Sequence, residues 1–157
     1  LLNHLSPFLH LHYFHYYLSS GLYENALGGS FPKRGDYEFI KKKTAEVFFD
    51  PKHATKELVD EVFETINNRS KLIKILAMAK SAMRHNMKKD LGQINVPTCI
   101  IWGENDQITP PKVAEEFNEL LPNSKLFWIK KCGHAPMMEQ SKEFNDIFCN
   151  WARKIKI

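Results

Sequence analysis

An aspartate and a histidine, each following an apolar run, are the residues of this 157-residue chain whose types and spacing could do chemistry. Asp106 follows the β-branched run at 96–102, and His134 follows a second short run at 126–129. Runs of this kind are typical of buried parallel strands, and the loops that leave the carboxyl ends of parallel strands meet at one sheet edge. The spacing therefore predicts that the Asp106 carboxylate lies beside the His134 imidazole.

A carboxylate beside an imidazole supports proton transfer. The carboxylate accepts the proton on one ring nitrogen, fixes the tautomer and stabilises the imidazolium that forms when the other nitrogen takes a proton. We therefore take Asp106 and His134 as candidate catalytic residues, the acid and base of a triad. The alternatives are an aspartate that caps its own turn and a histidine satisfied in a surface loop.

A helix should connect the two strands. Thr109 is its candidate N-cap, because prolines follow it and the missing proline N–H costs little in a first turn. Apolar residues spaced by three and four give the helix one face that packs on a sheet: Val113, Ala114, Phe117, Leu120 and Leu121. This strand, helix, strand unit should have a right-handed crossover and return a parallel strand to the same sheet.

Two further residues near His134 have structural interpretations. Cys132 could form a nucleophilic pair with the histidine, but adjacent side chains in an extended loop point apart, which disfavours that pairing. The loop that follows the second strand and carries His134 is the histidine loop. Glu139 is expected to anchor it by accepting backbone hydrogen bonds.

The composition is that of an ordinary globular protein, with 43% hydrophobic and 25% charged residues. The net charge is +4, but the lysines are scattered, so we expect no nucleic-acid partner. No run of about 18 apolar residues occurs, so we expect no membrane partner. The three cysteines lack CxxC spacing, which indicates neither a disulfide framework nor a zinc site and favours a cytoplasmic location.

The chain divides into four segments. Residues 1–18 are an atypical N-terminal segment, rich in His and Tyr, whose histidines lack the nearby Cys, Asp or Glu that would complete a metal site. Residues 19–35 are rich in Gly, Ser, Asn and Pro and mark a loop. Residues 36–95 contain three helical patterns without a strand, and residues 96–157 hold the two strands and a last helix that Ser141 should cap. The sequence thus predicts an α/β class with an all-helical insert.

The three helical patterns have identifiable ends. The first should stop at Asp50, because a residue before proline avoids the helical region. The second should begin at Thr55 and close at Asn67, and the third should end by His85.

The chain resembles the C-terminal portion of the α/β-hydrolase superfamily over roughly residues 19–157, through the blocks PTCIIWGENDQITP, LPNSKL and CGHAPMMEQSKEFNDIF. By motif, the resemblance implies that Asp106 and His134 are the triad acid and base. It also implies that residues 19–35 lead from a strand into a helical lid, that residues 36–95 form this lid, and that residues 96–157 are the C-terminal part of the core. The resemblance further implies no metal, no cofactor and a small hydrophobic substrate in the complete enzyme.

One part of the family pattern is missing. The family places its nucleophile on a GxSxG turn before the lid, and no GxSxG occurs here. Ser30 follows two glycines, but it lies where the lid should start, so we do not take it as the nucleophile. A truncated or frameshifted gene model upstream of Ser19 would explain both this absence and the atypical first segment.

Two hypotheses follow. In the first, the chain is the acid, base and lid portion of a hydrolase, in which a serine attacks an ester or related carbonyl-adjacent bond; related families use an aspartate nucleophile instead. In the second, it is a truncated, non-catalytic remnant or binding module. As such a fragment, the chain should self-associate through an exposed sheet edge.

Overall fold

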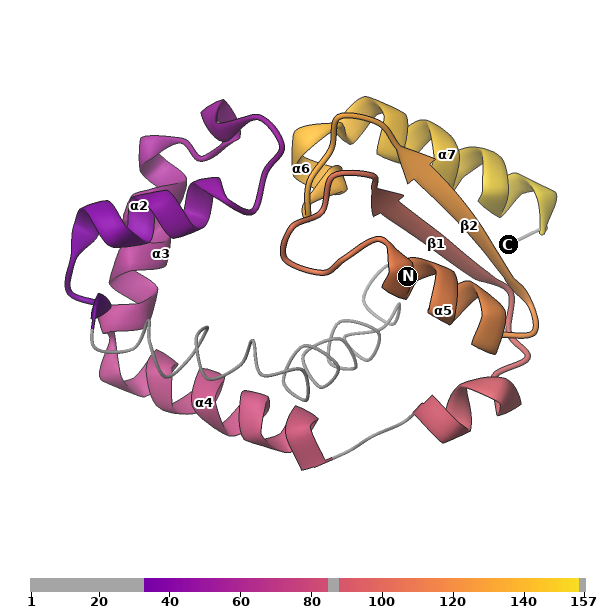
Figure 1. Ribbon diagram of the computed structural model, residues 1–157, viewed down its shortest axis with the longest axis horizontal. Helices are drawn as coiled ribbons and strands as arrows, with labels where there is room; N and C mark the ends of the chain where they lie inside the picture. The colour runs from indigo at the N-terminus through magenta and orange to yellow at the C-terminus, as the bar shows by residue number, and fades with distance from the viewer. Residues whose placement is uncertain (1–32, 85–87, 156–157) are drawn as a thin grey trace. The chain divides into compact units, whose positions relative to one another are not determined.

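The computed structural model describes residues 33–84 and 88–155, which form two compact units (Figure 1). A helical unit falls within Leu1–Lys41 and Lys56–Lys89. A sheet unit falls within Lys42–Thr55 and Asp90–Ile157. The sequence boundary at residue 95 instead groups residues 42–55 with the helices. The N-terminal histidines and Ser30 lie outside the described residues.

The sheet unit is built on two parallel strands, as the apolar runs predicted. Strand β1 (Thr98–Gly103) pairs with β2 (Ser124–Ile129) in register from the first residue of each strand to the last. Helix α5 (Lys112–Leu120) joins them, so that both strands point their carboxyl ends toward the same edge (Figure 1). This edge is where the Asp106 and His134 loops begin.

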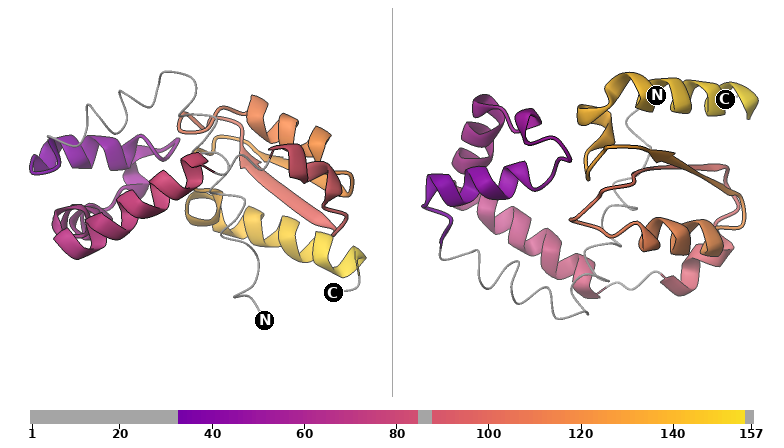
Figure 2. Two further views of the ribbon diagram at one scale, coloured as in Figure 1. Left: turned by 90° about the horizontal axis from the view of Figure 1, so that it is seen from below. Right: turned by 45° about the horizontal axis from the view of Figure 1, so that its top comes forward.

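Helices cover both faces of this sheet. Helix α5 lies on one face, and α7 (Ser141–Lys154), preceded by the short α6 (Pro136–Glu139), lies on the other (Figure 2). The apolar faces of the helices supply much of the core together with the strands, and the buried members are Val113, Ala114, Phe117, Ile100, Ile129 and Trp151. Each large buried side chain contributes roughly 1.5–3 kcal/mol, so this packing fixes the strand ends that carry the loops.

The helical unit contains α3 (Lys56–Asn67), α4 (Arg69–Arg84) and the first half of α2 (Tyr37–Ala45). Helix α3 begins after Thr55 and ends at Asn67, which confirms the bounds expected from the sequence. Tyr37 holds α2 to α3, since its hydroxyl donates to Asp60 Oδ1 at 2.6 Å and its ring meets Phe63 edge-on.

Three local expectations were wrong. Helix α2 ends at Ala45 instead of Asp50, and a turn leads from it to the short 3₁₀ helix η4 (Pro51–His53). Helix α5 begins at Lys112 after Pro111, with no side-chain cap, because the Thr109 hydroxyl is held elsewhere. Ser141 is the first residue of α7 and not its cap.

A second 3₁₀ helix, η5 (Lys88–Gln93), precedes β1.

Candidate active site

The loop that leaves β1 is tied by its backbone to the loop that leaves β2. The Glu104 N–H donates to the Ile129 carbonyl, and the Asn105 N–H donates to the Cys132 carbonyl, each at 3.0 Å. A Cβ at Gly103 would overlap the Cys132 carbonyl, so only glycine permits this close approach. The two loops therefore form one backbone layer at the sheet edge.

The histidine loop also packs closely on the segment that follows α2. The His134 N–H donates to the Val47 carbonyl at 2.7 Å. A Cβ at Gly133 would lie 2.5 Å from that carbonyl oxygen and 2.8 Å from the Phe49 nitrogen, closer than real Cβ atoms come. The backbone of His134 is thus held in place by the segment that follows α2.

Glu139 joins these segments. Its carboxylate is buried and accepts backbone N–H groups from Gly133 at 2.7 Å, Asp50 at 2.7 Å and Phe49 at 3.2 Å. Hydrogen bonds to a charged group contribute about 1.5–3 kcal/mol each. The expectation that Glu139 anchors the histidine loop is confirmed, and the same carboxylate holds the segment after α2.

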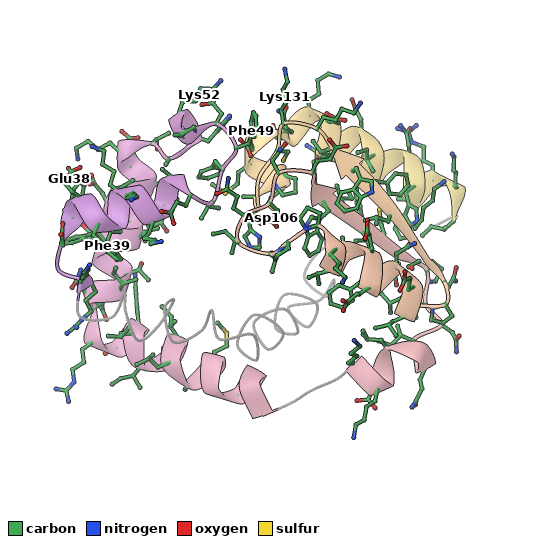
Figure 3. All side chains as sticks on the ribbon, in the orientation of Figure 1. Glu38, Phe39, Phe49, Lys52, Asp106 and Lys131 are labelled. Atoms are coloured by element: carbon green, nitrogen blue, oxygen red, sulfur yellow. The ribbon has the colours of Figure 1, made fainter. Side chains whose placement is uncertain are left out.

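The carboxylate of Asp106 meets the ring of His134 at this edge. Asp106 Oδ2 lies 2.8 Å from His134 Nδ1, and the two side chains are 2% and 23% exposed. The other oxygen, Oδ1, accepts the N–H groups of Ile108 and Thr109 at 2.8 and 2.9 Å. Asp106, labelled in Figure 3, therefore caps its own turn with one oxygen and holds the imidazole with the other.

This pairing confirms the predicted proximity of the two residues and defines what the site can do. An ionised carboxylate accepts the proton on Nδ1, which leaves Nε2 as the unprotonated ring nitrogen. In that tautomer the imidazole can take a proton through Nε2, and the carboxylate stabilises the resulting cation.

Thr109 belongs to the site, although the sequence suggested only a helix cap. Its Oγ1 lies 3.0 Å from Asp106 Oδ2 and 2.9 Å from His134 Nδ1. Its carbonyl accepts the Trp102 indole N–H at 3.3 Å, which fixes the loop to β1. The available signal was the spacing Asp106-x-x-Thr109, because an aspartate turn brings the third following residue back to the carboxylate.

Cys132 is fully buried and does not supply a reactive thiolate. Burial, with the Glu139 carboxylate nearby, raises the pKa of the Cys132 thiol from 9.0 to about 12. The thiolate is the nucleophilic form, and a thiol with this pKa is protonated near neutral pH. The interpretation of Cys132 as a non-nucleophilic residue is therefore supported.

The described residues form neither a metal site nor a membrane-spanning helix. Within 33–84 and 88–155, no group of three or more His, Cys, Asp or Glu residues is arranged to hold a metal ion. No helix in those ranges combines the length and the apolar character needed to cross a membrane.

Sequence comparisons find that the chain is similar to hydrolases. A family model described as "alpha/beta hydrolase fold" matches residues 46–141. Lipase 3 of Moraxella sp. (strain TA144) is 31% identical over 99 residues, which are 62% of this chain and 31% of the lipase. A 2-hydroxy-6-oxononadienedioate/2-hydroxy-6-oxononatrienedioate hydrolase of Pseudomonas sp. is 26% identical over 136 residues, which are 85% of this chain and 45% of that hydrolase.

Solved structures show the same relationship. An alpha/beta hydrolase enzyme from the metagenome of lagoon sediments at Mar Chica, Morocco, is 58% identical, with a TM-score of 0.60, over 65% of this chain and 47% of its own. A putative lipase from Acinetobacter baumannii AYE, at 22% identity and a TM-score of 0.67, shares the fold over 89% of this chain and 47% of its own. The chain thus spans from 31% to 47% of the length of these relatives. Because the family model covers more than half of the chain, including both loops of the site, the chain belongs to the alpha/beta hydrolase fold family.

Proposed function

We propose that Asp106 and His134 are the acid and base of a serine-dependent hydrolase that cleaves an ester or a related carbonyl-adjacent bond. The observation that carries this proposal is the 2.8 Å contact between the buried Asp106 Oδ2 and His134 Nδ1. Membership of the alpha/beta hydrolase fold family supports it, because a buried carboxylate that orients an imidazole is the arrangement that activates a serine.

The chemistry would proceed in two half-reactions, each with two proton transfers through His134. His134 Nε2 takes the proton of the serine hydroxyl as the serine oxygen attacks the carbonyl carbon. His134 then returns this proton to the leaving group, and a water molecule repeats the sequence to release the acid. Asp106 holds the Nδ1 proton throughout and stabilises the imidazolium, without becoming protonated itself.

The proposed substrate is small and largely hydrophobic. Relatives of this chain carry the names lipase and pimeloyl-[acyl-carrier protein] methyl ester esterase, both of which denote esters with hydrocarbon parts. We propose that the helical unit serves as the lid. On α4, Ile73 and Met78 are more than half exposed, which gives this unit an apolar surface suited to such a substrate.

A second candidate function is that of a non-catalytic module. The observation that favours it is that no GxSxG occurs in the sequence, so the nucleophile and its oxyanion hole must come from elsewhere for catalysis. The purified 157-residue chain should accordingly show no turnover of a short-chain nitrophenyl ester. Turnover that is lost in His134→Ala would contradict this expectation.

A chimera separates the two candidates. In the Mar Chica enzyme, residues 46–141 of this chain would replace the equivalent segment, and nitrophenyl ester hydrolysis would be measured. We expect activity that His134→Ala abolishes and that His53→Ala, at a histidine of η4 whose ring lies beside Phe48, leaves intact. A cooperatively folded chimera without activity, or one in which His134→Ala stays active, would refute the proposed hydrolase function.

A further inference from the structure

We propose that Thr109 is a positioning residue of the Asp106–His134 pair. Its hydroxyl donates to Asp106 Oδ2, the oxygen that also accepts the His134 Nδ1 proton, and so holds the ring in the Nδ1–H tautomer. The consequence for catalysis rests on the hydrolase function proposed above. The effect on the tautomer does not, because it is a property of the ring in the absence of substrate.

Thr109 contacts both oxygens of the same carboxylate. Its backbone N–H donates to Oδ1 at 2.9 Å, and its hydroxyl is 3.0 Å from Oδ2. Rotation of the carboxylate about its Cβ–Cγ bond would break both bonds. The Trp102 indole N–H on the Thr109 carbonyl restrains the threonine backbone in turn. The plane of the carboxylate that faces the imidazole is therefore set largely by this one residue.

With Thr109 in place, four donors surround the Asp106 carboxylate. Oδ1 accepts from the Ile108 and Thr109 N–H groups, and Oδ2 accepts from the Thr109 hydroxyl and from His134 Nδ1. An ionised carboxylate offers about four acceptor positions, so this arrangement fills them. Filling them matters because the side chain is only 2% exposed and water has little access.

The hydroxyl carries one proton and has two acceptors within reach. In the Nε2–H tautomer, Thr109 would donate to the Nδ1 lone pair 2.9 Å away, and Asp106 Oδ2 would lose both of its donors. In the Nδ1–H tautomer, Oδ2 keeps both. Since a buried charge without donors is costly, the Nδ1–H tautomer is favoured. The Thr109 hydroxyl supplies the second of the two donors to Oδ2 in that tautomer.

Nitrogen-15 NMR of the full 157-residue chain tests this inference through the ring nitrogens of His134. The variants are Thr109→Val, which removes the hydroxyl, and Thr109→Ser, which retains it. Thr98→Val is the matched control, because the Thr98 hydroxyl bonds only the Val96 carbonyl at the opposite end of β1 among the described contacts. We expect mostly Nδ1–H in the unsubstituted chain, a tautomer ratio about fivefold lower in Thr109→Val, and unchanged ratios in the other two.

An unchanged tautomer ratio in Thr109→Val would overturn the inference. If that variant does not fold, the unsubstituted chain decides the matter, since a predominant Nε2–H tautomer there would equally overturn it. In the active chimera, Thr109→Val should lower kcat about fivefold with little change in KM. A tautomer shift with an inactive chimera would refute only the hydrolase function, whereas an active chimera without a tautomer shift would refute only the role of Thr109.

Discussion

At Asp106, the turn cap and the pairing with His134 occur together, the first through Oδ1 and the second through Oδ2. The pairing with His134 was predictable because both residues follow apolar runs, and parallel strands bring their carboxyl ends to one edge. The part played by Thr109 was not, because a threonine before two prolines equally suits a helix start. Thr109 is a partner of Asp106 and not a helix cap because Asp106 Oδ1 closes a turn that brings Thr109 back to the carboxylate. This turn is seen only in the folded structure.

Replacing Asp106 by asparagine should switch the His134 imidazole to the other tautomer. The Asn carbonyl can still accept the Ile108 and Thr109 N–H groups, but its amide would face Nδ1 as a donor and favour the Nε2–H tautomer, which cannot act as a base. In the active chimera, kcat should fall on the order of 10⁴-fold, as in the Ser-His-Asp template. Asp90→Asn, within η5, serves as the control and should leave kcat unchanged. A loss of less than tenfold in Asp106→Asn would contradict the assigned role.

Cys132 should make the stability of the fold sensitive to alkaline pH. Its pKa is raised from 9.0 to about 12 in the folded chain, so the unfolded chain releases the thiol proton first. The contribution is fully present below pH 9 and is lost as pH rises from 9 toward 12, by about 1.4 kcal/mol per pH unit. Urea unfolding at several pH values measures this loss. The free energy of unfolding should decline less steeply with pH in Cys132→Ala than in the unsubstituted chain, whereas Cys149→Ala, at an exposed cysteine, should show the same decline as the unsubstituted chain. Identical slopes for Cys132→Ala and the unsubstituted chain would disprove this dependence.

Among the elements, those set by local signals were predictable and those set by distant contacts were not. Helix α3 has its expected bounds because a threonine precedes it and two asparagines close its apolar pattern. Helix α2 stops five residues before the expected end because the backbone that follows it forms hydrogen bonds with the histidine loop and with Glu139. The Phe49 and Asp50 N–H groups bond Glu139, about ninety positions away in sequence, and no local pattern reports such a partner.

The close contact between the histidine loop and the segment after α2 should make Gly133 intolerant of substitution. In Gly133→Ala, the new methyl group would meet the Val47 carbonyl and the Phe49 nitrogen, which are backbone atoms that cannot move aside singly. We expect a loss of about 1–3 kcal/mol in the free energy of unfolding, measured by urea denaturation. Gly35→Ala is the control, since its methyl group would meet nothing within 4 Å, and it should be neutral or slightly stabilising. Equal midpoints for the two variants would show that the loop contact is not tight in solution.

At the scale of the whole molecule, the described residues hold a small sheet of two strands. A two-stranded sheet is marginal by itself and gains its stability here from α5 and α7, one on each face. The α/β class and the parallel pairing could be predicted, since they follow from apolar runs and a connecting helix. The assignment of residues 42–55 to the sheet unit could not, because it depends on where Glu139 and Gly133 lie after folding.

The same small sheet leads to a prediction about association. Strand edges that lack a neighbour are templates for pairing with another chain, and charged residues weaken such pairing. The purified chain should therefore associate as its concentration rises, with sedimentation velocity showing species larger than a monomer. Val96→Lys, at a position 63% exposed just before β1, should shift the distribution toward the monomer because it places a charge beside the strand edge. Glu119→Lys, on the exposed side of α5, changes the chain charge in the same direction without touching that edge and should have a smaller effect. A single monomeric species at all concentrations would show that the edges are protected within the chain itself.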